Sequence, residues 1–243
     1  MPFGLKNAGA TYQRLVNKMF SKMLGSTIEV YIDDMLVKSL IAQQHIEHLK
    51  QSFDVLDQYG MKLNPTKCSF GVSSGKFLGY LVTQKGVEAN PYQIQSIRGI
   101  ESPRCIKDVH KLTGRIAALN RFISKSSERC YPFFNTLRKN KAFEWNDECE
   151  KALQDLKEYL ISPPLLSKPK DNKTLLMYLA VSNTAVSAIL FREENDRQYP
   201  VYYVSKALLD AETRYSRLEK LALALVVAVR KLRPYFQDRK SVV

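Results

Sequence analysis

The 243-residue sequence predicts an α+β fold in which short strands and amphipathic helices alternate in blocks along the chain. Residues 28–37 alternate between apolar and polar side chains around a pair of carboxylates, a pattern typical of a β-hairpin. Residues 46–56 and 109–123 carry apolar side chains at spacings of three and four, which indicates helices. Three β-rich runs followed by one long helix complete the pattern in the last hundred residues.

The first hairpin is predicted from a strand that places Ile28, Val30 and Ile32 on one face. Asp33-Asp34 interrupts this strand, and Met35-Leu36-Val37 resumes it. The two carboxylates are therefore expected at the tip of the hairpin.

The next elements are a helix and a strand. The helix is predicted to end at Gly60. Residues 77–82 are expected to form one strand between the turn residues 73–75 and 85–86. The apolar stripe of the helix consists of Ile46, Leu49, Phe53 and Leu56.

The segment 91–141 is the basic part of the chain, with 11 basic and 3 acidic residues. Its helical stripe is expected to be buried while the basic side chains stay in water. The segment is then either a solvated helix face or a surface that contacts phosphates. The stripe is Val109, Leu112, Ile116, Leu119 and Ile123, and the basic residues outside it are Lys111, Arg115, Arg121 and Lys125.

The last hundred residues predict strands at 175–181, 186–191 and 201–204, after a linker or surface loop around 163–173. A helix should follow and stop at Pro234. Its expected buried stripe is Tyr215, Leu218, Ala222, Leu225, Val229 and Leu232.

Composition and charge narrow the function classes. A net charge of +13 favours a polyanionic partner, with nucleic acid first and an acidic membrane surface second. The longest apolar run, Leu221–Val229, is too short to span a bilayer, and no signal peptide is visible. Four widely spaced cysteines indicate neither a disulfide framework nor a zinc knuckle. We expect an intracellular protein, cytoplasmic or nuclear, with reduced thiols.

Asp33 and Asp34 are the strongest candidates for chemistry. Carboxylate oxygens suit Mg²⁺, and two such ions can clamp the attacking and leaving oxygens of a phosphoryl transfer. The alternative is a plain turn, because Asp is a favoured turn residue.

Four ordered motifs resemble those of reverse transcriptases. Tyr31-Ile32-Asp33-Asp34 is similar to the family's tyrosine-x-Asp-Asp box, and residues 1–13 (MPFGLKNAGATYQ) resemble the motif before it, with Gly9 where the family usually has proline. Residues 63–68 (LNPTKC) and 77–80 (FLGY) resemble the next two boxes. The likeness is greatest to gypsy-type polyproteins of plant long-terminal-repeat retrotransposons, in particular the Tat-like lineage.

The resemblance implies a role for each matching residue. Asp33 and Asp34 match the metal-site carboxylates of the palm, and Gln13 matches a residue that supports the template side. The incoming nucleotide is expected near Phe3, Gly4 and Lys67. The template-primer set adds Tyr31 and the primer grip, a hairpin that holds the primer end. Its matching residues are Phe77, Leu78, Gly79 and Tyr80. For Phe3, Gln13 and the primer-grip aromatics, packing in a core or hairpin is the alternative.

The resemblance also divides the chain into a partial palm (1–90), a basic helical thumb (91–141) and a degenerate, incomplete RNase H-like or connection domain (142–243). In the thumb, the basic residues at 111, 115, 121 and 125 are expected to contact the nucleic-acid backbone. In the RNase H-like domain, Ala180 and Leu221 stand where active relatives have acids. A shifted alignment would instead make Glu219 the second acid.

The implied parent activity is RNA-directed DNA synthesis with Mg²⁺ on an RNA/DNA template-primer. Other polyprotein segments (upstream palm and fingers, downstream RNase H and integrase) are the further implied partners, and no membrane is expected. A third carboxylate lies upstream of these motifs in the family, so we expect the chain to be inactive alone. The alternatives are a domesticated, non-catalytic nucleic-acid-binding protein and an unstable pseudogene product.

Overall fold

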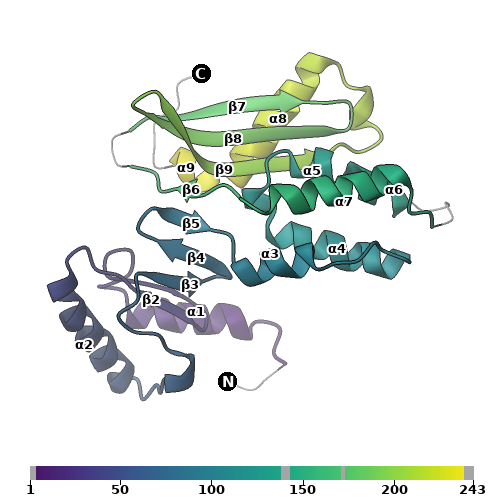
Figure 1. The fold of residues 1–243 in the computed structure, drawn as a ribbon. Helices are drawn as coiled ribbons and strands as arrows, with labels where there is room; N and C mark the ends of the chain where they lie inside the picture. Colours follow the sequence, from purple (N-terminus) through teal and green to yellow (C-terminus); the bar gives the residue numbers. More distant parts are fainter. Residues whose placement is uncertain (1–3, 138–142, 171–172, 238–243) are drawn as a thin grey trace. The chain divides into compact units, whose positions relative to one another are not determined.

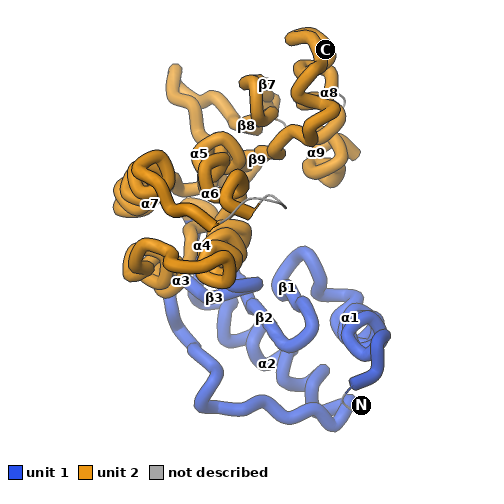
Figure 2. Tube along the Cα trace, turned by 90° about the vertical axis from the view of Figure 1, so that its right-hand side faces the viewer, with its two compact units in different colours: residues 1–84 blue, residues 85–243 orange. Residues whose placement is uncertain are grey.

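The computed structural model describes residues 4–137, 143–170 and 173–237, and it confirms a mixed helix and sheet fold. The chain forms two compact units, residues 1–84 and 85–243 (Figure 2). The expected domains 91–141 and 142–243 therefore pack within one unit. No helix of the described residues is both long and apolar enough to cross a membrane.

Unit 1 is built from two hairpins and two long helices (Figure 1). Strands β1 and β2 pair antiparallel, as do β3 and β4. The bounds are α1 Ala8–Met19, β1 Ile28–Tyr31, β2 Asp34–Val37, α2 Ala42–Gln58, the 3₁₀ turn η1 Pro65–Lys67, β3 Ser74–Phe77 and β4 Tyr80–Thr83.

The core of unit 1 lies between α1, α2 and the first hairpin. Val16 of α1 and Phe20, which follows the helix, pack with Ile28 and Val30 of β1, and Leu56 of α2 joins the same cluster. Burial of this apolar surface orients α1 along the hairpin.

The stripe predicted for α2 is only partly buried. Leu56 is buried, but Ile46 is 77% exposed and Phe53 is 39% exposed. Phe53 packs edge-to-face against Phe70, with ring centroids 6.2 Å apart, so its partner is a loop residue rather than the core. The helix ends as predicted, because Gly60 adopts a φ of 63° just beyond it.

The strand expected at residues 77–82 is wrong, because the chain turns back within it. Phe77 closes β3 and pairs with Tyr80, which opens β4. Leu78 and Gly79 form the turn with φ angles of 53° and 77°. Positive φ at both central residues matches the twist of a two-residue hairpin, but leucine is an unusual residue there.

Unit 2 contains the basic helices, a short strand pair and a three-stranded sheet (Figure 1). Its first part comprises β5 Gly86–Glu88, α3 Pro91–Arg98, α4 Ile106–Ala118, the 3₁₀ turn η2 Asn120–Phe122, α5 Ser126–Arg129, α6 Tyr131–Thr136 and α7 Asp147–Tyr159. Its second part comprises β6 Leu166–Ser167, β7 Leu175–Val181, β8 Ala185–Glu194, β9 Arg197–Ala207, the 3₁₀ turn η3 Glu212–Arg214, α8 Arg217–Lys231 and α9 Arg233–Gln237.

The stripe predicted for the basic segment is confirmed. Val109, Leu112, Leu119 and Ile123 are fully buried, and Ile116 is nearly so. Because most other positions of α4 are polar, this stripe is the face that enters the core.

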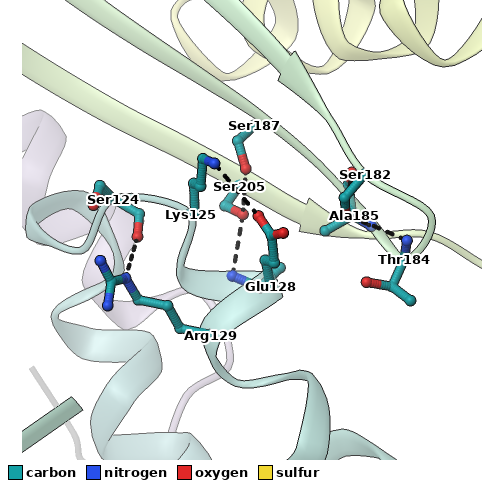
Figure 3. A network of polar contacts seen from close by, with 10 residues as sticks. Ser124, Lys125, Glu128, Arg129, Ser182, Thr184, Ala185, Ser187 and Ser205 are labelled. Carbon is teal, nitrogen blue, oxygen red and sulfur yellow. Dashed lines mark hydrogen bonds and ion pairs between the residues drawn. The ribbon is translucent and has the colours of Figure 1, made fainter. Parts of the chain in front are cut away.

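Strands β7, β8 and β9 form an antiparallel meander with β8 in the middle, as the three β-rich runs predict. Helix α8 packs on one face, where Ala188 and Leu190 meet Ala228 and Leu232. Helix α5 contacts β8 and β9. There Ser205 Oγ accepts the Ser127 N–H at 3.1 Å and lies 3.0 Å from Ser187 Oγ (Figure 3).

The stripe predicted for α8 is mostly wrong, because Leu232, which follows the helix, is the one buried residue among its six members. The buried residues of the helix are Lys220, Ala224 and Ala228, whereas Leu218 is 77% exposed and Leu225 is 36% exposed. The helix is apolar on two faces, and the face with the smaller alanine side chains lies against the sheet. Small side chains let the helix approach the strands closely.

We expect Leu232→Ala to lower the free energy of unfolding by about 2–5 kcal/mol, because Leu232 is fully buried. Leu218→Ala, at an exposed member of the same predicted stripe, is the matched control and should change it by no more than about 0.5 kcal/mol. Urea unfolding followed by circular dichroism measures both. Equal effects of the two substitutions would contradict the burial pattern of α8.

Candidate functional site

The carboxylate pair lies at the tip of the β1–β2 hairpin. Tyr31 pairs with Asp34 in the strand register, so the turn consists of Ile32 and Asp33. Asp33 and Asp34 are exposed, as predicted for a hairpin tip. Ile32 is a turn residue rather than the last residue of the strand, and its φ is 50°. A β-branched residue rarely adopts this conformation, so the turn needs support from elsewhere.

Gln13 of α1 supplies that support. Its Oε1 accepts the Ile32 N–H at 2.6 Å, and its Nε2 donates to the Val30 carbonyl at 3.1 Å. The side chain therefore holds the backbone on both sides of Tyr31. The contact with template that the resemblance implies for Gln13 stays a prediction.

The second hairpin meets the first at Asp34. The Leu78 N–H donates to Asp34 Oδ2 at 3.1 Å, although 44 positions separate the two residues. Packing reinforces this contact, because a Cβ placed on Gly75 of β3 would lie 3.0 Å from Leu36 Cδ1 of β2. The structure thus brings a predicted metal-site residue and the predicted primer-grip turn together.

The negative charge of Asp33 affects the pKa of a side chain in α1. Burial raises the pKa of the Tyr12 hydroxyl, and the negative charge of Asp33 raises it further. Tyr12 precedes Gln13, so the same turn of α1 contacts the hairpin tip and experiences its charge.

The predicted nucleotide-binding residues are less closely connected to this site. Lys67 is exposed in η1, where Asn64 Oδ1 accepts the Thr66 N–H at 3.1 Å and so caps the turn. Gly4 is exposed with a φ of 93°. Phe3 lies outside the described residues. The hydrogen bonds described between the two hairpins and α1 include neither Gly4 nor Lys67.

The carboxylates at the hairpin tip are suitable ligands for a hard cation such as Mg²⁺, but they are few. Asp33 and Asp34 contribute carboxylate oxygens, one of which already accepts the Leu78 N–H. Within the described ranges, no three His, Cys, Asp or Glu residues gather in a group that could hold a metal ion. The two aspartates therefore suit part of a magnesium site.

Three of the four predicted backbone-binding cations are exposed. Lys111 pairs with Asp108 at 3.2 Å, and Lys125 lies 3.9 Å from Glu128 (Figure 3). Arg115 donates to the Ser96 carbonyl at 2.6 Å. Lys111 and Arg115 also line a cavity of about 390 Å³ between α3 and α4.

Arg121 does not belong to this exposed set, contrary to the sequence prediction. Its guanidinium lies 4.6 Å from the ring centroid of Tyr202 in β9, and it is half-buried. Its positive charge lowers the pKa of Tyr235, although burial raises that pKa more. Arg121 therefore joins the basic helices to the sheet.

The positions that match RNase H acids are apolar and separated. Ala180 is exposed near the end of β7, where the neighbouring residues Leu179 and Val181 pack toward α8. Strand alternation places Ala180 on the opposite face of the sheet. Leu221 is half-buried in α8, between the buried Lys220 and the exposed Ala222.

Glu219 takes part in capping the N-terminus of α8. Its carboxylate accepts the Ser216 N–H at 2.7 Å, and Ser216 Oγ accepts the Glu219 N–H at 3.3 Å. This capping box lowers the pKa of Glu219. The contact gives Glu219 a structural role in the helix.

Two segments of the chain match family models. Residues 1–82 match the family model described as reverse transcriptase (RNA-dependent DNA polymerase). Residues 145–243 match the model of the RNase H-like domain found in reverse transcriptase.

The Tf2-3 and Tf2-7 transposon polyproteins of Schizosaccharomyces pombe are each 29% identical over 239 residues. The match covers 98% of this chain, which spans 18% of the length of each polyprotein.

Solved structures show the same fold. The foamy viral protease-reverse transcriptase in complex with an RNA/DNA hybrid aligns with a TM-score of 0.84 at 22% identity, over 96% of this chain and 32% of the viral one. The same viral protein in complex with double-stranded DNA aligns with a TM-score of 0.81 over 97% of this chain and 49% of that one. Residues 1–82 are therefore similar to reverse transcriptases and residues 145–243 to the RNase H-like domain found in them, in a chain that is similar over 98% of its length to transposon polyproteins.

Proposed function

We propose that the chain forms palm, thumb and RNase H-like segments of a reverse transcriptase from a gypsy-type element of the Tat-like lineage. The observation that carries the proposal is the hydrogen bond from the Leu78 N–H to Asp34. It joins the carboxylate hairpin to the hairpin that matches the primer grip, so a primer end held by one would lie near the other.

In this proposal Asp33 and Asp34 hold part of the Mg²⁺ site. The bound ion would neutralise charge on the reacting phosphoryl oxygens. The residues of the chain position the site: Gln13 fixes the turn that carries Asp33, and Leu78 orients the carboxylate of Asp34. Gly4 and Lys67 are the proposed nucleotide-side residues.

The basic helices are proposed to grip the duplex backbone of an RNA/DNA template-primer. Lys111, Arg115 and Lys125 are exposed, and Gly114 between the first two leaves open space on α4. Cations beside a small residue suit close approach of a sugar–phosphate backbone. Such contacts give affinity without reading sequence.

We further propose that this polypeptide does not polymerise DNA alone. Positioning and charge neutralisation supply most of the catalysis in phosphoryl transfer. Two carboxylates leave the ions underliganded, and other segments of the polyprotein would have to complete the site.

A non-catalytic nucleic-acid-binding protein is the second candidate. It is supported by the exposed cations of the basic segment and by the apolar residues Ala180 and Leu221 at the positions of RNase H acids. A primer-extension assay on a longer polypeptide with upstream segments distinguishes the two candidates. Only the first predicts that this longer polypeptide extends a primer.

The purified chain should show no template-primed nucleotide incorporation with Mg²⁺ or Mn²⁺, because its metal site is incomplete. A primer-extension assay measures this, with the Asp33→Ala, Asp34→Ala double variant as the background. Extension by the wild-type chain above that background would contradict the proposal.

Nucleic-acid binding should be weak, independent of sequence and strongly dependent on salt, because phosphate contacts release counterions. Replacing Lys111, Arg115 and Lys125 by Ala should make the slope of log affinity against log salt concentration less negative. On duplex DNA we expect a change in slope of about 2–3, close to one for each lost contact. Fluorescence anisotropy at several salt concentrations gives the slope.

Arg121→Ala is the matched control for this series. Arg121 stacks on Tyr202, so its loss should lower thermal stability and leave the salt slope unchanged. An unchanged slope in the triple variant, or a flattened slope in Arg121→Ala, would show that the exposed cations have been wrongly assigned.

The chain should not cleave the RNA of an RNA–DNA hybrid, since its RNase H acid positions are Ala180 and Leu221. Glu219→Gln is a conservative probe, because glutamine also forms a capping box. Cleavage by the wild type that disappears in Glu219→Gln would mean that Glu219 is a catalytic residue after all.

A further inference from the structure

Helix α8 is apolar on two faces, and the fold buries only one of them. The covered face contains the buried residues Lys220, Ala224 and Ala228 and lies on the β7–β9 sheet (Figure 1). The opposite face carries apolar residues at spacings of four, three and four. We call this face the outer stripe, and its members are Leu218, Ala222, Leu225 and Val229.

The outer stripe is exposed, although the sequence predicts that it is buried. Leu218 and Ala222 are exposed, Leu225 is 36% exposed and Val229 is half-buried. Val226, which lies next to the stripe, is 44% exposed. Contiguous exposed apolar side chains mark interaction sites, and alternating spacings of three and four are typical of a seam between two helices. The outer stripe therefore suits a second helix as its partner.

Charges along one edge of the outer stripe indicate which helix that partner is. Glu219 directly follows Leu218, and Arg230 directly follows Val229, so both lie on the same edge of the stripe. Both side chains are exposed. They are about three helical turns apart, or about 16 Å along the axis. An acid near one end and a base near the other make this edge complementary to its own copy in the reverse direction.

We propose that two copies of the chain associate through their outer stripes, with the two α8 helices antiparallel about a twofold axis near Leu225. Glu219 of each copy then lies beside Arg230 of the other, so the interface contains this pair twice. Glu219 can form the pair and keep its capping box, because only its Oε2 accepts the Ser216 N–H. A parallel arrangement would instead place Glu219 beside Glu219 and Arg230 beside Arg230, and like charges repel.

This interface uses none of the residues that we propose to contact nucleic acid or Mg²⁺. Failure of the association would therefore leave the proposed function untouched, and the two are tested separately.

The test is sedimentation velocity of the full chain, freed of nucleic acid, over a wide range of protein concentration. We expect the average mass to rise from that of one chain to that of two and to stop there, because a closed twofold interface leaves no free copy of itself. Dilution separates this association from the stability of a single chain, since only the association depends on protein concentration.

Substitutions in α8 locate the interface. Leu225→Lys should weaken association at least about tenfold, because the lysines of the two copies meet near the twofold axis. Ile161→Lys is the matched control: it makes a similar change just beyond α7, at a residue that is 63% exposed, and should associate as the wild type does. Circular dichroism shows whether each variant folds.

Substitutions of Arg230 test the antiparallel direction. Arg230→Glu should weaken association, because it places an acid beside Glu219 of the second copy. Arg230→Gln should have a smaller effect, since it removes the attraction without adding a repulsion.

A chain that stays monomeric at every concentration, or that grows beyond two copies, would overturn the proposal. A dimer that Leu225→Lys leaves unchanged would overturn it as well, and one that Arg230→Glu leaves unchanged would overturn the antiparallel arrangement. If Leu225→Lys does not fold, Arg230→Glu decides the matter, because Arg230 is exposed and its replacement removes no core packing.

Discussion

The candidate site depends on the strained turn at the tip of the first hairpin. A β-branched residue in the left-handed region costs of order 1–3 kcal/mol, and Ile32 has a φ of 50°. The hydrogen bonds of Gln13 contribute about 0.5–1.5 kcal/mol each, and a bond to a carboxylate such as Asp34 contributes about 1.5–3 kcal/mol. The turn is therefore held from outside the hairpin, by α1 on one side and by the Leu78 turn on the other. The direction of both carboxylates follows from these contacts.

Those contacts in turn depend on the apolar core of unit 1. Val16 lies in α1 beyond Gln13, and Phe20 directly follows the helix. Both pack against Ile28 and Val30 of β1. The helix cannot slide along the hairpin without leaving cavities in this cluster. A packing constraint some residues away thus sets the position of the amide that supports Ile32.

The sequence predicted where the helices and strands lie better than it predicted which of their faces are buried. The stripe of α4 could be predicted because its remaining positions are polar. In α8 apolar residues occupy both faces, so spacing alone could not distinguish Leu218 and Leu225 from Ala224 and Ala228, and close packing on the sheet decided the outcome. The apolar run 77–82 predicted one strand, because leucine rarely adopts positive φ and so gives no turn signal. The resemblance to the primer grip, in contrast, implied a hairpin. The contact between Asp34 and Leu78 has no signal in local spacing, since it forms only when two separate hairpins pack.

The RNase H-like domain has contacts that suit support of the basic helices. Glu219 forms the capping box of α8, so the acid nearest to the expected catalytic position stabilises a helix start. On the sheet, Ser205 accepts the Ser127 N–H from α5, and Tyr202 receives the guanidinium of Arg121. The basic segment and the sheet accordingly form one compact unit. In the proposed function, a domain that fixes the basic helices needs these contacts and no acids on β7 or α8, so Ala180 and Leu221 at the matching positions would leave that role intact.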